Sequence, residues 1–363
     1  MGISINVIEK KQREDINWVR LIANYMIVLY HAGAASQYVQ HGTRELFVWR
    51  MIADVLVSVS LPALFLISGF LLMKSFSMEA FKDKFFRRVK RLFVPFVVWN
   101  LTFVVFYLSC ARFVPRLSSR VASFGLNTLS GALSKTIGFM SAPIDGPLWF
   151  LRTILIYTLL APMIWHGLKI CKGVFVYLAV LAWWLLSIYL SLGERLISTY
   201  PVYSLVCFIV GAHLSFLKIE PFKLLVSRVA RSVTLLIGLV GVILYCIYEY
   251  HFVYTYSSLR DISLILATPF LFVVVSFFNL CVRESQTLNF LIQSSFFIYA
   301  GHFLFCSMLL HAIAPLLNGI EFLGKQTLLV AIFFVGGAIL SLSVYGVARR
   351  VLGRLFSLWD GTL

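Results

Sequence analysis

Apolar runs long enough to cross a lipid bilayer recur along the whole chain, and they constrain its fold more than any other feature. A helix needs about 20 mostly apolar residues to span the hydrocarbon core. Of the 363 residues, 60% are hydrophobic, and the mean hydropathy is +0.91. A soluble domain of this length requires a more polar exterior than this composition allows. The sequence therefore predicts an all-α polytopic membrane protein.

About ten transmembrane helices are expected, with both termini in the cytoplasm and no soluble domain attached. In this orientation the cytoplasmic segments hold about twice as many Lys and Arg as the external loops, as the positive-inside rule requires. The predicted spans are 16–35, 51–73, 92–110, 147–166, 172–192, 200–217, 231–250, 260–280, 290–313 and 327–350. The predicted division is a cytoplasmic tail at 1–15, a membrane domain at 16–350 and a second cytoplasmic tail at 351–363.

Two loops between the predicted spans stand out. The cytoplasmic loop 74–91 is strongly basic, and the external loop 111–146 is long. The middle of the external loop, "VASFGLNTLSGALSKTIGFM", is expected to form an amphipathic helix on the outer membrane surface. The net charge of +16 follows from topology and predicts no nucleic-acid partner. The six cysteines show no close-paired spacing, so neither a metal site nor a disulfide framework is expected.

The first predicted span contains a stripe of polar residues, Asn17, Arg20, Asn24 and His31. Their spacing places them on one face of a helix, with Arg20 and His31 ~16 Å apart along its axis. The same residues argue against a cleaved signal peptide, although basic residues precede the segment. Arg20 alone would be read as an interfacial anchor and His31 as a hydrogen-bonding partner of another helix. A polar stripe facing lipid is costly, so we expect it to face a protein interior or a polar cavity.

The Arg-x10-His spacing in the first span resembles the mark of the acyltransferase-3 membrane proteins, which acylate surface carbohydrates. Further segments resemble landmarks of that family in the same order along nearly the whole chain. These segments are "LFLISGFLL" (64–72), "FFRRVKRLFVPFVVWN" (85–100), "GPLWFLRTILIYTLLAP" (146–162), "FIVGAHL" (208–214) and "SSFFIYAGHFLF" (294–305). One departure is Asn17, since the family often has an acidic residue three positions before the arginine.

The resemblance implies acetyl-CoA, or another acyl-CoA such as succinyl-CoA, as the donor. It assigns the donor's phosphates to one helical stripe of the basic loop, consisting of Lys84, Arg87, Arg88 and Arg91. The alternative for this stripe is that it only determines topology. Ser68 and Gly69 are small enough to leave a slot for the pantetheine arm or to let two helices pack closely.

Arg152 is a third catalytic candidate beside Arg20 and His31, and Asp54, Trp149, Tyr299 and His302 are candidates for supporting roles, as are Asn17 and Asn24. Arg152, preceded by Trp149, is expected to hold the acceptor or a developing oxyanion, or else to pair with Asp54. Trp149 by itself is an ordinary interfacial anchor. Tyr299 and His302 share a helix face and either support the cavity or hydrogen-bond between helices.

The predicted function is a membrane-bound transfer of an acyl group, most simply acetyl, from cytoplasmic acyl-CoA to a carbohydrate hydroxyl. His31 would act as general base or as an acyl relay, and Arg20 would orient the donor. The expected partners are membrane lipids and a surface carbohydrate, free or lipid-linked, and the expected location is the bacterial inner membrane. The rival class is a secondary transporter, which would often show internal repeats or broken helices that the sequence does not reveal. An assembly subunit without chemistry is the third alternative.

Overall fold

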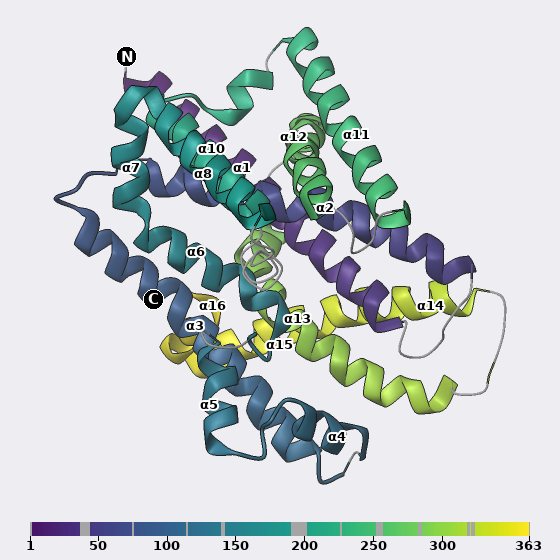
Figure 1. Cartoon of the computed structure of the whole chain (residues 1–363). Coiled ribbons are helices and arrows are strands. Elements are labelled where there is room, and N and C mark those ends of the chain that lie inside the picture. The colour runs from purple at the N-terminus through teal and green to yellow at the C-terminus, as the bar shows by residue number, and fades with distance from the viewer. Residues whose placement is uncertain are drawn as a thin grey trace. The chain divides into compact units, whose positions relative to one another are not determined.

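The computed structural model describes residues 2–36, 44–74, 76–113, 115–138, 142–189, 202–225, 227–251, 257–281, 285–317, 320 and 324–362. Every secondary-structure element within these ranges is a helix, and the described residues contain no strand (Figure 1). The all-α prediction is confirmed. The chain is an integral membrane protein, because its long helices are apolar enough to cross a bilayer.

The α-helices are α1 (Gly2–Ser36), α2 (Arg44–Met73), α3 (Phe81–Cys110), α4 (Pro115–Ser123), α5 (Leu129–Ile137), α6 (Trp149–Leu159), α7 (Ala161–Lys169), α8 (Val174–Tyr189), α10 (Val202–Phe216), α11 (Arg228–His251), α12 (Ser257–Cys281), α13 (Gln286–Leu317), α14 (Lys325–Ala331), α15 (Gly337–Leu352) and α16 (Ser357–Asp360). Short 3₁₀ turns are η1 (Gly146–Leu148), η2 (Ile170–Gly173), η3 (Pro221–Leu225) and η5 (Gly353–Phe356), and a π-helical turn, η4 (Ile332–Gly336), joins α14 to α15.

Each predicted span overlaps a helix, although residues 190–201 at the ends of two spans lie outside the described residues. Among the described helices, six are long and apolar enough to span a membrane, or seven if an interrupted pair counts as one span. The number ten and the cytoplasmic termini therefore stay predictions. Helix α1 starts at Gly2 and α3 at Phe81, so both helices extend into segments predicted as a tail and a loop.

Two segments differ from what the sequence predicts. The fourth span, predicted as continuous, is interrupted at Leu160, where α6 has ended and α7 begins with Ala161. Pro162 is the cause, since it has no amide hydrogen to donate and its ring clashes with the preceding turn. The amphipathic stretch of the external loop forms α5 and the end of α4 instead of one helix. Gly125 has a φ of +69° and Thr128 caps α5 through Gly131, which together end one helix and start the next.

The chain forms two compact units. Unit 1 comprises Met1–Gly33, Gly42–Glu79 and Leu160–Ser295, and unit 2 comprises Ala34–His41, Ala80–Leu159 and Phe296–Leu363. In unit 1, α2 packs closely on α10 at Gly69 and Gly211, and α11 packs on α12 at Gly241. These glycines let the helix backbones approach, as small residues commonly do in membrane proteins.

Unit 2 is built around α3, whose Trp99 packs edge-on against Phe297 of α13 with ring centroids 5.0 Å apart. The end of the chain folds back on this helix, because Trp99 Nε1 donates a hydrogen bond to the Trp359 carbonyl at 3.0 Å. Tyr345 of α15 and Phe356 also contact the Phe297 ring. The predicted C-terminal tail thus contributes η5 and α16 to the aromatic core of unit 2.

Candidate functional site

The polar stripe predicted in the first span lies on α1, in unit 1. Asn24 is buried, and its Nδ2 donates a hydrogen bond to the Ser295 carbonyl of α13 at 3.1 Å. The Arg20 side chain is exposed, while Asn17 and His31 are half-buried. Asn24 thus shows the helix-to-helix hydrogen bonding expected of a buried amide. Arg20 and His31 keep accessible side chains, which a residue that meets a substrate needs.

A pocket of about 340 Å³ lies beside the His31 end of α1, between α2 and α11 of unit 1. We call it the carboxylate pocket, and its lining residues are Phe47, Arg50, Met51, Asp54, Tyr245, Cys246, Glu249 and Tyr250. The charges of Asp54 and Glu249 act on Tyr30, the residue before His31, which connects the pocket to the stripe. Asp54, predicted as a supporting residue, therefore lies near the histidine end of the stripe.

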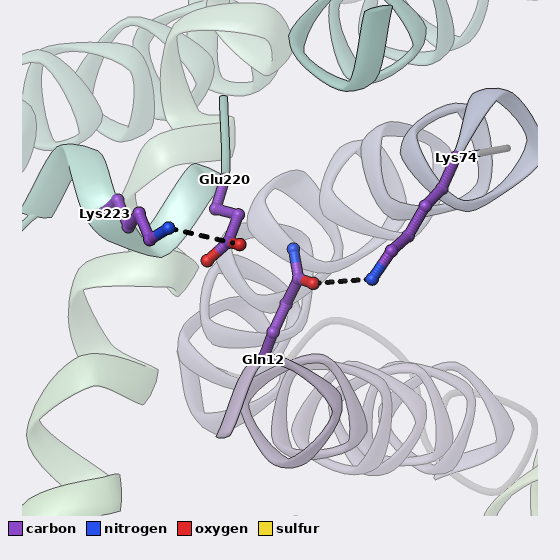
Figure 2. A network of polar contacts seen from close by, with 4 residues as sticks. All are labelled: Gln12, Lys74, Glu220 and Lys223. Atoms are coloured by element: carbon purple, nitrogen blue, oxygen red, sulfur yellow. Dashed lines mark hydrogen bonds and ion pairs between the residues drawn. The ribbon is translucent and has the colours of Figure 1, made fainter. Parts of the chain in front are cut away.

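A second pocket of about 340 Å³ lies near the other end of α1, also in unit 1. We call it the lysine pocket, and its lining residues are Gln12, Phe70, Met73, Lys74, Phe76, Trp165, Ser215, Phe216, Lys218 and Glu220. Lys74 donates to Gln12 Oε1 at 2.8 Å, and Glu220 pairs with Lys223 at 3.3 Å (Figure 2). Gln12 and Tyr30 are separated by 18 residues of α1, or ~27 Å of helix, which is close to the thickness of the hydrocarbon core.

Arg152 and Asp54 are the alternative ion pair offered by the sequence, and each of them interacts with another residue of its own unit. Asp54 forms an ion pair with Arg50 of the same helix, with 3.8 Å between Oδ2 and Nε. Arg152, on α6 of unit 2, is buried and its Nη1 donates to the Gly138 carbonyl at 2.6 Å. Each residue therefore has a partner of its own.

Gly69 lies at the contact between α2 and α10. A Cβ atom added there would be 2.8 Å from the Phe208 carbonyl carbon and 3.1 Å from the Ala212 nitrogen. The α10 backbone fills the space beside this glycine, and the neighbouring Ser68 is half-buried. Close helix packing therefore explains Gly69 without a ligand.

The basic stripe predicted for donor phosphates is helical, because α3 begins at Phe81. Lys84, Arg87, Arg88 and Arg91 accordingly share one face over the first three turns of that helix. Arg87 and Arg91 are exposed, and Lys84 and Arg88 are half-buried. The stripe belongs to unit 2.

Tyr299 and His302 of α13 make hydrogen bonds inside unit 2. The Tyr299 hydroxyl donates to the Pro147 carbonyl in η1, and its ring packs against Phe150 of α6. His302 Nδ1 lies 2.6 Å from the Tyr299 carbonyl oxygen of the preceding turn. Trp149 is half-buried at the start of α6. Tyr299 thus ties α13 to the 3₁₀ turn before α6, which matches the structural alternative for this residue.

The sequence did not predict the buried carboxyl group of Asp145, the residue that directly precedes η1. Asp145 is completely buried, and neither of its carboxyl oxygens has a hydrogen-bond partner among the described residues. Its backbone N–H donates to Oδ1 of Asn100, which is also completely buried. Burial raises the pKa of Asp145 well above its usual range, because removal from water disfavours the charged form of a carboxyl group. An asparagine in the apolar run of α3 was the available signal for this cluster.

These observations define the class of protein: a polytopic helical membrane protein with polar pockets near both ends of its first helix. Residues 13–347 match the family model described as an acyltransferase domain, so the chain belongs to the acyltransferase-3 family and is a membrane acyltransferase. No curated protein and no solved structure matches the chain. The predicted residues of such a site divide between the units. Unit 1 holds Asn17, Arg20, Asn24, His31, Asp54, Ser68 and Gly69, and unit 2 holds Lys84, Arg87, Arg88, Arg91, Trp149, Arg152, Tyr299 and His302.

Proposed function

We propose that this membrane acyltransferase transfers an acetyl group from cytoplasmic acetyl-CoA to a hydroxyl group of a surface carbohydrate. The observation that carries the proposal is the Arg20–His31 pair, which lies on one face of α1 in a chain of this family. We place the protein in the bacterial inner membrane, where a cytoplasmic donor and an external carbohydrate can be reached by one molecule. Succinyl-CoA is the alternative donor.

The two pockets of unit 1 support a reaction that joins the two sides of a membrane. They lie near opposite ends of the stretch of α1 that carries Arg20 and His31. With the N-terminus inside, the lysine pocket faces the cytoplasm and the carboxylate pocket faces outward. The donor would therefore enter from the lysine end and the acceptor from the His31 end.

The carboxylate pocket has the chemistry that carbohydrates require. Tyr245 and Tyr250 offer flat apolar rings to the C–H face of a sugar. Asp54 and Glu249 accept hydrogen bonds from sugar hydroxyl groups when they are ionised. The volume of about 340 Å³ suits one or two sugar units of a larger acceptor.

His31 is the proposed catalytic group. Its imidazole accepts the proton of the acceptor hydroxyl while that oxygen attacks the thioester carbonyl. The carbon–sulfur bond then breaks, the thiolate of CoA leaves and takes the proton from His31, and an ester remains on the sugar. A two-step relay, in which His31 carries the acyl group between donor and acceptor, uses the same residue.

Three further roles are proposals for charged residues. Arg20 orients the thioester carbonyl, and Arg152 stabilises negative charge that develops on it. The stripe of α3, namely Lys84, Arg87, Arg88 and Arg91, binds donor phosphates, for which guanidinium groups have the appropriate geometry.

The test is acetyl transfer by purified protein in membrane vesicles that contain isolated cell-surface glycans, read by mass spectrometry of the glycans. His31→Ala should lower the rate by about 10²–10⁴-fold, the usual contribution of a general base. The matched control is His311→Ala, a half-buried histidine of α13 that lines neither of the two pockets, which should keep the full rate. Full activity of His31→Ala in correctly inserted protein would refute the assignment.

A further inference from the structure

The lysine pocket contains a buried hydrogen-bond donor that none of the described residues satisfies. Gln12 is only 6% exposed, and its Oε1 faces Lys74 because it accepts a hydrogen bond from that ammonium group. The amide Nε2 must then point the other way, into the space between Lys74 and Glu220 (Figure 2). This nitrogen is buried and makes no hydrogen bond to the described part of the chain. An unsatisfied buried donor costs ~1–3 kcal/mol, so the site is built for a ligand that accepts a hydrogen bond.

Lys218 gives a second, independent indication. It follows the end of α10 with a φ of 58° and is the sole non-glycine residue with a positive φ among those the structure describes. The Ile219 N–H donates to the Leu214 carbonyl at 2.8 Å, which closes a helix C-cap of the kind that glycine normally occupies. A lysine in this conformation is strained by ~1 kcal/mol or more. Its side chain lines the lysine pocket, which gives a reason for a lysine at this position.

The charges of the pocket favour an anion. Lys74 and Lys218 line it, while Glu220, the single carboxylate among the described lining residues, is already paired with Lys223. Lysines at the ends of α2 and α10 also offset the helix dipoles and fit the positive-inside rule, which is the simpler explanation for them. That explanation accounts for neither the buried Gln12 amide nor the strained backbone at Lys218.

Two aromatic side chains that line the lysine pocket indicate which kind of anion it binds. Trp165 and Phe76 line the pocket with ring centroids 5.9 Å apart, and Lys169 lies 3.6 Å over the Trp165 ring. Such rings bind a planar nucleobase well. An anionic lipid headgroup shares the phosphate chemistry but has no planar ring to contact Trp165 and Phe76.

We propose that the lysine pocket binds the phosphorylated adenine nucleotide end of the acyl-CoA donor. Lys74, Lys218 and the Gln12 amide donate to phosphate oxygens, and Trp165 contacts the adenine ring. This assignment rests on the proposed function.

The proposal is tested by equilibrium binding of CoA and of adenosine 3′,5′-bisphosphate to the full chain in neutral-lipid nanodiscs. The variant Lys218→Gly removes the side chain and places the residue type best suited to this φ, so the fold is preserved. We expect a dissociation constant about tenfold higher for both ligands, as for loss of one charge-assisted hydrogen bond. Gln12→Leu should also weaken binding. The control Arg228→Gln removes a positive charge from the same unit without touching the pocket and should change nothing.

Three outcomes would overturn the assignment. Unchanged binding in both pocket variants is the first, and a loss of affinity in Arg228→Gln equal to that in Lys218→Gly is the second. The third is a loss of CoA binding when the nanodiscs contain phosphatidylglycerol, together with no binding of free adenosine 3′,5′-bisphosphate in neutral-lipid nanodiscs. That result would make the site a lipid site. The proposed function fails separately, if His31→Ala keeps its acetyl transfer while nucleotide binding still depends on Lys218.

Discussion

Replacing Gly69 by alanine inserts a methyl group where the backbone of α10 already lies. The new Cβ would be 2.8 Å from the Phe208 carbonyl carbon and closer still to its oxygen. Ordinary contact begins at 3.4 Å, so α2 and α10 must separate by at least the 0.6 Å difference. The obstacle is main chain inside a helix, which cannot turn aside as a flexible side chain can. A Cβ atom added to the opposing residue Gly211 would likewise lie too close to main chain, 2.7 Å from the Leu66 carbonyl carbon of α2.

The expected loss in the free energy of unfolding follows from two opposing effects. Overpacking a well-packed contact costs ~1–3 kcal/mol. Alanine gains up to about 1 kcal/mol over glycine in helix propensity. Since rigid backbone must move, we expect the upper part of the range and a net loss of about 2 kcal/mol for Gly69→Ala. Gly211→Ala should cost a similar amount, and the double variant less than the sum, because one separation makes room for both methyl groups.

The assay is denaturant unfolding of the purified protein in mixed micelles, followed by tryptophan fluorescence. The control is Gly346→Ala in α15, where an added Cβ would meet nothing within 4 Å. That variant should be neutral or more stable by up to about 1 kcal/mol, since only propensity changes. If Gly69→Ala proves as harmless as Gly346→Ala, or if the two interface variants add fully, the proposed close contact between α2 and α10 is wrong.

Two further predictions concern polar groups. Asn24→Ala should lower the free energy of unfolding by about 1 kcal/mol, because it removes the hydrogen bond to the Ser295 carbonyl; unfolding in the same micelles measures this, and an unchanged value would contradict the contact. Burial raises the pKa of Asp145 well above its usual range. Its stabilising effect is therefore complete below the unfolded pKa of about 4 and is lost as pH rises toward the folded value. Asp145→Asn should reduce the fall in stability as pH rises above the unfolded pKa of about 4, and an equally steep pH dependence in that variant would show that Asp145 is not its source.

Much of the secondary structure of this protein can be predicted from its sequence, because a lipid bilayer permits few backbone conformations. Backbone groups in lipid must be hydrogen-bonded internally, so long apolar runs such as those of α2 and α12 have to be helices. The spacing of Arg20 and His31 is enough to place both on one face of α1, since helical periodicity is local. The interruption at Leu160 is harder to predict because the apolar run continues through it, although Pro162 is visible in the sequence.

The sequence by itself determined the helical class, the polar stripe of α1 and membership of the acyltransferase-3 family, because these depend on composition, periodicity and motif order. Only the tertiary structure decided which residues meet across helices. Gln12, Lys74 and Lys218 are far apart along the chain, and nothing local predicts that they line one pocket. The burial of Asp145 and the contact of Gly69 with α10 likewise depend on neighbours supplied by other helices. Local patterns set where each helix forms, and packing between helices created the pockets in which chemistry can occur.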